Sequence, residues 1–253
     1  MKKHYSLFAL TFLLIISCSK SDNPSLENRQ ELFLSKIESV VKNNTLEITD
    51  TFNFVYDEDN YLIRYDYQAS NMFNYSKTLT YSNGQLATLD DFTISIDNDL
   101  ITLTSDNSKQ EYYVENNKII QYKWYHFEQS SSSYFLYVTT NLTFDNNFQN
   151  VIKTEHFNSK GELIQYSNFE YDDKNNPFSN FINIFNLSVN IIGTAFNSKN
   201  NITRVEVFEL SGFGGFGIPS IGTYSYTYNN SNYPKSLDYN FNGFNAKSNY
   251  IYK

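Results

Sequence analysis

The chain has 253 residues and a formal net charge of −8, and aromatic and charged residues each make up 18% of it. A composition rich in aromatic and poor in charged residues excludes an intrinsically disordered chain, which has the opposite bias. The acidic balance, without any cluster of Lys or Arg, excludes nucleic-acid binding and gives no electrostatic attraction to anionic lipid.

Residues 1–17 are predicted to be a signal peptide. Lys2 and Lys3 form a short basic start, and residues 5–16 are an apolar run. This run is shorter than the roughly 20 residues that a membrane-spanning helix needs, and it fits the apolar region of an export signal.

The residues at the predicted cleavage site resemble a lipobox, in which a small residue precedes an invariant cysteine. They read Ile15-Ile16-Ser17-Cys18, with Ile in the place where Leu is commoner. Cys18 is the only cysteine, so it cannot form an internal disulfide, and lipidation would explain an unpaired cysteine in an exported protein. The resemblance implies membrane attachment through acyl chains on Cys18, since two or more such chains anchor stably. The alternative is an ordinary secretory signal whose cleavage site carries a cysteine.

The segment 18–27 is polar and contains Pro24, which is typical of a flexible tether. It is followed by a predicted single β domain over 28–253. Asp22 resembles part of the acidic surface-export signal of Bacteroidota lipoproteins, so the periplasmic side and the cell surface both stay open.

Alternating apolar and polar residues predict antiparallel strands from residue 36 onward. A strand over 36–41 leads to an Asn43-Asn44 turn, and a hairpin follows, with strands over 46–56 and 61–67. In its first strand the apolar face is interrupted once, by Asp50. In its second strand the apolar face is predicted to include Ile63, and the polar face Leu62.

The same unit recurs along the chain: a strand ends in an aromatic or aliphatic residue, an Asn/Asp-rich corner follows, and another strand begins. Asn and Asp suit such corners because they tolerate left-handed backbone and accept hydrogen bonds from nearby backbone N–H groups. Turn chemistry also explains the acidic corner 57–60 better than calcium binding, because the Gly and Glu of a dedicated Ca²⁺ loop are missing. The corners start at Tyr56-Asp57, Tyr81-Ser82, Ile96-Asp97, Val114-Glu115, Phe144-Asp145, Phe157-Asn158, Tyr171-Asp172, Phe196-Asn197 and Tyr228-Asn229.

These aromatic-Asp corners resemble the YD repeats of RHS-type proteins. More closely, the chain resembles Bacteroidota lipoproteins of unknown function that have a porin-like β fold. The resemblance depends on the lipobox, the Tyr-Asp corners, Asn176-Pro177-Phe178 and a C-terminal block of alternating tyrosines over 224–252. It implies a fold and a compartment, and no activity.

The strand over 122–127 carries the best candidate for a ligand platform. Tyr122, Trp124 and His126 share one face, and Tyr125 and Phe127 share the other. Core packing is the favoured interpretation of these aromatic residues, and the alternative is a platform for a glycan or an envelope protein partner. His126 and His156, the only histidines beyond residue 17, are interpreted as ordinary strand residues, because a zinc site usually needs three or four ligands.

Two segments depart from the alternation. Phe178, Phe181, Ile182 and Phe185 have helical spacing and predict a short helix near 178–192 that packs on the apolar sheet face. The segment 212–217 matches G-x-G-x-x-G, but it precedes a strand rather than the helix that a dinucleotide site requires, so it is interpreted as a loop.

The sequence therefore predicts an all-β protein, an antiparallel meander curled into an open or partly closed barrel-like sheet. We expect a non-enzymatic binding or scaffolding lipoprotein of the outer membrane, with no cofactor, metal or catalytic site. The alternatives are an exported hydrolase with dispersed catalytic residues and a membrane-spanning β-barrel, which the lipobox makes less favoured.

Overall fold

The computed structural model describes residues 32–42, 47–70, 74–178, 197–210 and 215–253. Residues Phe33–Lys253 form a compact unit that contains every described strand. The predicted signal peptide, Cys18, the tether and the predicted helix beyond Phe178 lie outside the described residues. The described part of the chain contains no helix that is long and apolar enough to cross a membrane.

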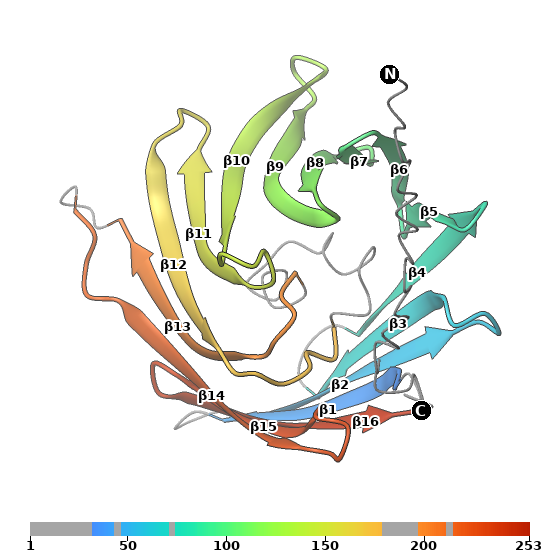
Figure 1. Cartoon of the computed structure of the whole chain (residues 1–253). Coiled ribbons are helices and arrows are strands. Elements are labelled where there is room, and N and C mark those ends of the chain that lie inside the picture. The colour runs from blue at the N-terminus through green and yellow to red at the C-terminus, as the bar shows by residue number, and fades with distance from the viewer. Residues whose placement is uncertain (1–31, 43–46, 71–73, 179–196, 211–214) are drawn as a thin grey trace, which may run out of the picture. The chain divides into compact units, whose positions relative to one another are not determined.

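The described residues form sixteen strands that close into one barrel (Figure 1). Each strand is antiparallel to its neighbours in sequence, and β1 pairs with β16 to close the ring, with Ile37 opposite Tyr250. The prediction of an antiparallel meander is confirmed, and the sheet is fully closed. The strands are β1 (Leu34–Lys42), β2 (Glu47–Tyr56), β3 (Leu62–Ala69), β4 (Tyr75–Ser82), β5 (Gln85–Leu89), β6 (Phe92–Asp97), β7 (Leu100–Thr104), β8 (Ser108–Glu115), β9 (Lys118–Glu128), β10 (Ser133–Phe144), β11 (Val151–Asn158), β12 (Leu163–Tyr171), β13 (Ile202–Glu209), β14 (Ser220–Tyr228), β15 (Pro234–Phe241) and β16 (Phe244–Tyr252).

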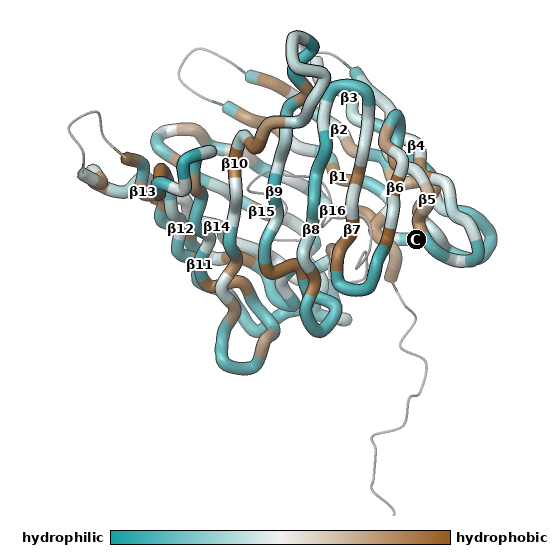
Figure 2. The backbone as a smooth tube through the Cα atoms, turned by 90° about the horizontal axis from the view of Figure 1, so that it is seen from above, coloured by the Kyte–Doolittle hydropathy of each residue, from teal (hydrophilic) through white to brown (hydrophobic). Residues whose placement is uncertain are grey.

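The two faces of the sheet differ in polarity, as the alternation predicts. Brown and teal segments alternate along the strands in Figure 2. Leu34, Leu103 and Tyr112 are at most 1% exposed and belong to a buried cluster that connects β1–β5 with β7–β9. A second cluster around Val205 joins β12 and β13. In a closed barrel the shielded side chains point inward, so this apolar and aromatic surface is the inner face.

The predicted hairpin over 46–67 is confirmed in β2 and β3, with one error of orientation. The register shifts between Val55 and Tyr56 of β2, where a β-bulge places Ile63 as an extra residue in β3. Leu62, predicted to lie on the polar face, is 2% exposed and packs in the core, as does Tyr65. A single extra residue reverses the face of every residue beyond it, and alternation in the sequence does not reveal a bulge.

The connections between strands fall into two groups because consecutive hairpins of a meander alternate between the ends of the barrel. The connections that follow even-numbered strands share one end with the start of β1 and the C-terminus, where Lys253 N–H donates to the Phe33 carbonyl (2.9 Å). We call this the packed end. The connections that follow odd-numbered strands lie at the other end, which we call the mouth.

The aromatic-Asx corners have a common geometry. In the corner after β14, the Asn229 Oδ1 atom accepts hydrogen bonds from the N–H groups of Ser231 and Tyr233 (both 3.0 Å), and Asn232 is left-handed with φ 61°. Asp57 binds Asp59 and Tyr61 N–H in the same way. At many corners the register shifts within the last three residues of the strand. The predicted role of Asn and Asp in these turns is confirmed.

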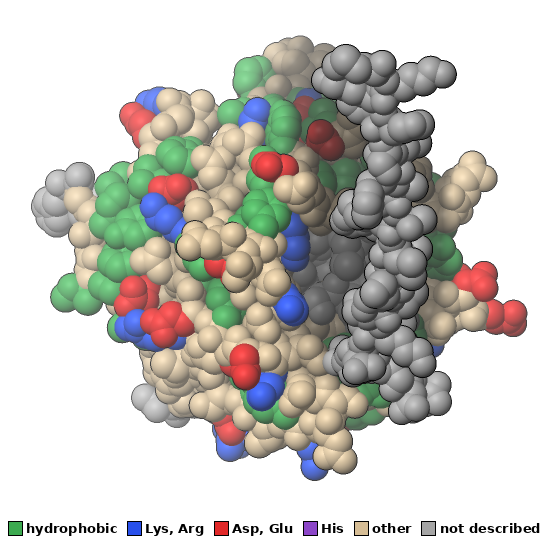
Figure 3. Space-filling model, in the orientation of Figure 1, with side chains coloured by type: hydrophobic (Ala, Val, Ile, Leu, Met, Phe, Trp, Pro, Cys, Tyr) green, Lys and Arg blue, Asp and Glu red, His purple; other side chains and the backbone are tan. Residues whose placement is uncertain are grey.

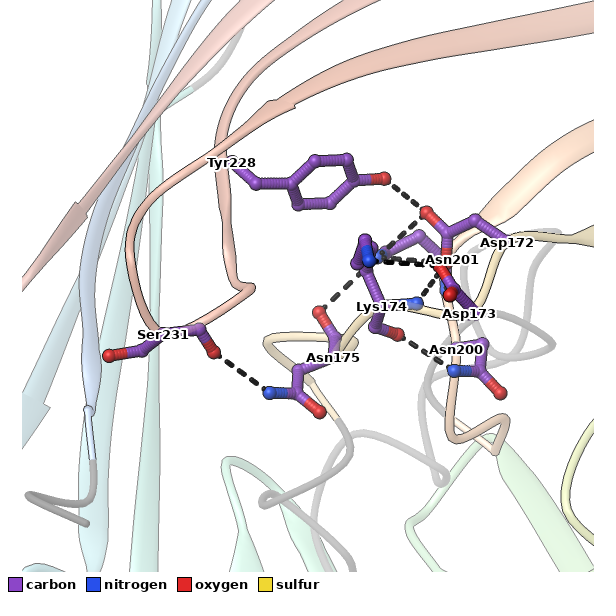
Figure 4. Close-up of polar contacts among 8 residues, drawn as sticks. All are labelled: Asp172, Asp173, Lys174, Asn175, Asn200, Asn201, Tyr228 and Ser231. Carbon is purple, nitrogen blue, oxygen red and sulfur yellow. Dashed lines mark hydrogen bonds and ion pairs between the residues drawn. The ribbon is translucent and has the colours of Figure 1, made fainter.

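At the packed end, the connection from β12 to β13 is bound to neighbouring hairpins through polar side chains (Figure 4). Asp172 accepts hydrogen bonds from the Tyr228 hydroxyl and from Asn201 Nδ2 (3.2 Å), and Asn175 Nδ2 donates to the Ser231 carbonyl (3.0 Å). Asn197, which is 1% exposed, donates to the Ile119 carbonyl of β9 (2.7 Å). This network joins hairpins from several parts of the ring and holds the packed end together.

Candidate functional site

Large aromatic side chains are exposed on the inner face at the mouth. Trp124 of β9 is 36% exposed, and Phe135 and Tyr137 of β10 are 50% and 63% exposed. The Trp124 and Tyr137 rings meet edge to face, with centroids 5.1 Å apart. A register shift between Leu136 and Val138 inserts Tyr137 as an extra residue beside Trp124. The bulge therefore adds an aromatic ring to the mouth.

The predicted platform residues share one face of β9, as expected, but their surroundings differ. Tyr122 packs against the core cluster, with its ring centroid 6.0 Å from that of Tyr112. Trp124 is partly exposed, and His126 is exposed near the mouth, opposite Phe135. Core packing accounts for Tyr122, while the exposed aromatic surface consists of Trp124 and the two β10 residues that the sequence analysis missed. The alternation along β10 does not single out Phe135 and Tyr137, because the bulge that places Tyr137 beside Trp124 is not visible in the sequence.

A polar row continues from Tyr122 across the inner face. Tyr122 is directly opposite Thr140, and Thr140 is directly opposite His156. The Thr140 Oγ1 and His156 Nδ1 atoms are 2.7 Å apart, and Thr140 is 1% exposed. Burial lowers the pKa of His156 below its ordinary value of 6.5, so the ring is neutral at pH 7. His156 therefore offers hydrogen bonds rather than positive charge to the interior.

A second polar row crosses β16, β1 and β2. Ser248 is opposite Ser39, and Ser39 is opposite Asp50, the residue that interrupts the apolar pattern of its strand. The two serine hydroxyl oxygens are 2.9 Å apart, and the Ser39 side chain is hydrogen-bonded to Asp50. Burial raises the pKa of Asp50 above its ordinary value of 3.8. Asp50 thus places a carboxylate on the inner face at the end of a row of serines.

The outer face carries ion pairs formed within single strands. Lys109 Nζ lies 2.8 Å from a Glu111 carboxylate oxygen, and the Tyr125 hydroxyl donates to the same carboxylate (2.7 Å). Blue and red side chains lie beside one another on the surface in Figure 3. A basic residue two positions before an acidic one is the signal in the sequence, and it was missed. The pairs are Lys36–Glu38, Arg64–Asp66, Lys109–Glu111, Lys153–Glu155 and Arg204–Glu206.

The glycine-rich segment leads into a strand, as expected for a loop. Gly215 and Gly217 precede β14, which is antiparallel to β13, and Leu210 forms an isolated bridge with Phe216. The antiparallel order is incompatible with the strand–loop–helix unit of a dinucleotide site. Across the described ranges, no group of three or more His, Cys, Asp or Glu side chains is arranged to hold a metal ion.

Neither a protein-family model nor any curated protein matches the sequence. Among solved structures, a porin-like protein from Bacteroides uniformis aligns with 87% of this chain and 96% of its own, at 12% identity and a TM-score of 0.46. A porin-like protein from Bacteroides vulgatus covers 88% and 99%, at 10% identity and a TM-score of 0.40. A LolA superfamily protein from Nitrosomonas europaea covers 88% and 86%, at 11% identity and a TM-score of 0.21. Similarity at this level says nothing about ligand or activity.

Proposed function

We propose that this chain is a lipid-anchored, non-enzymatic protein of the cell envelope whose barrel binds the apolar part of a ligand at its mouth. The observation that carries the proposal is the exposed aromatic surface of Trp124, Phe135 and Tyr137, on the same face as the buried interior. Aromatic side chains contribute large apolar contact areas, and contiguous exposed apolar surface is typical of binding sites.

The anchor is supported by the sequence pattern that ends in Cys18. The chain enters β1 at the packed end, so a tether on Cys18 would join the barrel at the end opposite the mouth. Both the periplasmic side of the outer membrane and the cell surface are compatible with this attachment.

The outer face argues against a membrane-spanning barrel. Arg204 and Lys153 lie within their strands, and each pairs with an acid on the same face. A basic side chain on a lipid-facing strand costs about 2–4 kcal/mol at the membrane midplane, and such residues occur on β1, β3, β8, β11 and β13. The charged face therefore favours water outside the barrel.

The surroundings of His156 argue against the hydrolase alternative. In a Ser-His-Asp triad the acid binds the histidine Nδ1 atom and orients the ring. In this barrel the Nδ1 atom of His156 lies 2.7 Å from the Thr140 hydroxyl, and Asp50 contacts Ser39 through a different part of the sheet. The described residues thus favour binding over acyl transfer.

The proposal is tested by titrating 1-N-phenylnaphthylamine, an apolar dye that fluoresces in apolar surroundings, into a chain that begins at Ser19. The shortened chain keeps the whole compact unit Phe33–Lys253 and lacks residues 1–18, the predicted signal peptide and Cys18. We expect saturable binding that weakens by about thirtyfold in a Phe135→Ala, Tyr137→Ala double variant, because two apolar contacts of about 1 kcal/mol each are removed.

The matched control is Ile251→Ala on the outer face of β16, where Ile251 is 42% exposed. It removes a comparable exposed apolar side chain and should leave dye affinity unchanged. Dye binding that is absent, or that both variants weaken equally, would contradict a binding site at the mouth.

A further inference from the structure

Asp50 is placed to contact a ligand that has entered through the mouth. It is the fourth residue of β2, and β2 begins at the mouth end. Ser39 and Ser248 continue the polar row on the neighbouring strands, while Ile48 on one side of Asp50 is 9% exposed and Phe52 on the other packs against the core. A carboxylate therefore lies between two apolar side chains of its own strand and beside two serines, within the first few residues of the mouth.

Among the described residues, one oxygen of this carboxylate has no hydrogen-bond partner. The Asp50 Oδ1 atom is buried and unpartnered, although the carboxyl group is hydrogen-bonded to the Ser39 side chain. No described Lys or Arg forms an ion pair with it; Lys77, on the inner face of β4, pairs with Asp90 instead. An ionised carboxylate has about four acceptor positions, and buried polar atoms are nearly always satisfied. Within the described part of the chain no donor occupies this oxygen, so it is open to a donor from a ligand.

Aromatic rings lie next to this carboxylate, two residues further along β2 into the barrel. The Tyr67 ring centroid is 4.7 Å from that of Phe52 and 5.0 Å from that of Tyr75. Tyr67 is directly opposite Phe52, and Ala69, two residues further along β3, is opposite Asp50. Burial raises the pKa of Tyr67, and the nearby charge of Asp50 adds to this increase. Tyr75 is 44% exposed, so the row of rings reaches solvent.

Resting on the proposed function, we propose that Asp50 is the subsite for a protonated amine of an amphipathic ligand, with the faces of Phe52 and Tyr67 beside it. A carboxylate and aromatic faces both attract a cation, through a charge-assisted hydrogen bond and through the ring quadrupole. A neutral hydroxyl could bond to Oδ1 but would leave the carboxylate charge uncompensated in an apolar setting. An ammonium group compensates it, and the alkyl part of the ligand then lies on the inner face.

The test compares three ten-carbon competitors that differ only in their polar group: decylammonium, decanol and decanoate. Each displaces 1-N-phenylnaphthylamine from the chain that begins at Ser19. We expect decylammonium to compete at least tenfold better than decanol, and decanoate to compete worst. In Asp50→Asn the preference for the amine over the alcohol should fall to about twofold or less, with decanol affinity unchanged.

The matched control is Asp238→Asn, which removes an acid of the outer face that pairs with Lys247 (2.9 Å) and should keep the amine preference. Asp50→Ser serves as a second variant, and thermal melts establish that both variants are folded. Equal competition by amine and alcohol in the wild-type chain, or a preference that survives both Asp50 variants, would overturn the amine subsite while leaving binding at the mouth intact. Absence of dye binding altogether would overturn the proposed function itself.

Discussion

Asp50 is a carboxylate on a wall of apolar side chains, and burial raises its pKa above the ordinary value of 3.8. A group whose pKa is raised on folding binds its proton more tightly in the folded state, so the folded state loses stability as the pH rises above the unfolded value. At pH 7 the charged form therefore carries a cost. A residue that is costly to the fold and interrupts the apolar pattern of its strand is a reasonable candidate for function.

Replacing Asp50 with Asn should stabilise the protein at pH 7. The amide keeps an acceptor for the Ser39 hydroxyl and removes the buried charge. We expect thermal denaturation at pH 7 to show a Tm raised by a few degrees, and the gain to shrink toward pH 3, where Asp50 is protonated in both states. A lower Tm for Asp50→Asn at pH 7 would show that the carboxylate stabilises the fold through a bond that Asn cannot make.

His156 should make the protein sensitive to mild acid. Its pKa is lowered by burial, so its contribution to stability is complete above pH 6.5 and is lost as the pH falls through its folded value. Denaturant unfolding of His156→Gln from pH 7.5 to pH 5 should show a smaller loss of unfolding free energy than the wild-type chain. His126→Gln, at an exposed position of β9, should keep the wild-type slope. Equal slopes for all three proteins would contradict a buried, neutral His156.

At the scale of elements, the corner chemistry was predictable because it is local. Asp57 and Asn229 bond to backbone within four residues, and the sequence shows both the acceptor and the turn residues. Strand β1 and the β2–β3 hairpin were likewise predicted from alternation. The bulges beside Tyr56 and at Tyr137 were not, because they depend on how two strands align rather than on either strand alone. The mouth was therefore only partly predictable, from Trp124.

Removing one corner acceptor should destabilise its hairpin. Asp145 accepts from the N–H groups of Gln149 (2.8 Å) and Asn150 (3.2 Å). Asp145→Ala leaves these donors without that partner and should cost about 2 kcal/mol, which corresponds to a Tm lowered by about 4–8 °C for a domain of this size. Asp145→Asn keeps an acceptor and should lose less than half of this.

Asp173→Ala is the control for the corner variant, because the Asp173 side chain is 86% exposed and forms a surface ion pair with Lys174 (3.1 Å). It should shift Tm by no more than about 2–4 °C, since exposed ion pairs contribute about 0–1 kcal/mol. A Tm for Asp145→Ala equal to that of Asp173→Ala would mean that the corner bonds contribute little to stability.

For the whole molecule, closure was beyond the sequence. It depends on pairing β1 with β16, as in Ile37 opposite Tyr250, and nothing local marks these strands as partners. The direction of the two faces follows from closure: the aromatic face turns inward, and the ion-paired face turns outward. Pairs such as Lys36–Glu38 could have indicated a water-facing surface from the sequence, because their two-residue spacing places both side chains on one face.

The charged outer face predicts that the barrel needs no membrane to fold. A chain that begins at Ser19 should be monodisperse without detergent, and its circular dichroism should be dominated by β structure. Aggregation of this chain in water, reversed by detergent, would instead support the membrane-spanning alternative. Size-exclusion chromatography with and without detergent distinguishes the two outcomes.

In the proposed binding mode a ligand enters the mouth and lies beside Trp124, the only tryptophan of the chain. A decylammonium analogue that carries bromine in its alkyl chain quenches tryptophan emission only on close contact. We expect saturable quenching of Trp124 emission with one ligand bound per chain, and excess unbrominated decylammonium should restore the emission. Quenching that rises linearly without saturation, as for tryptophan in solution, would contradict it.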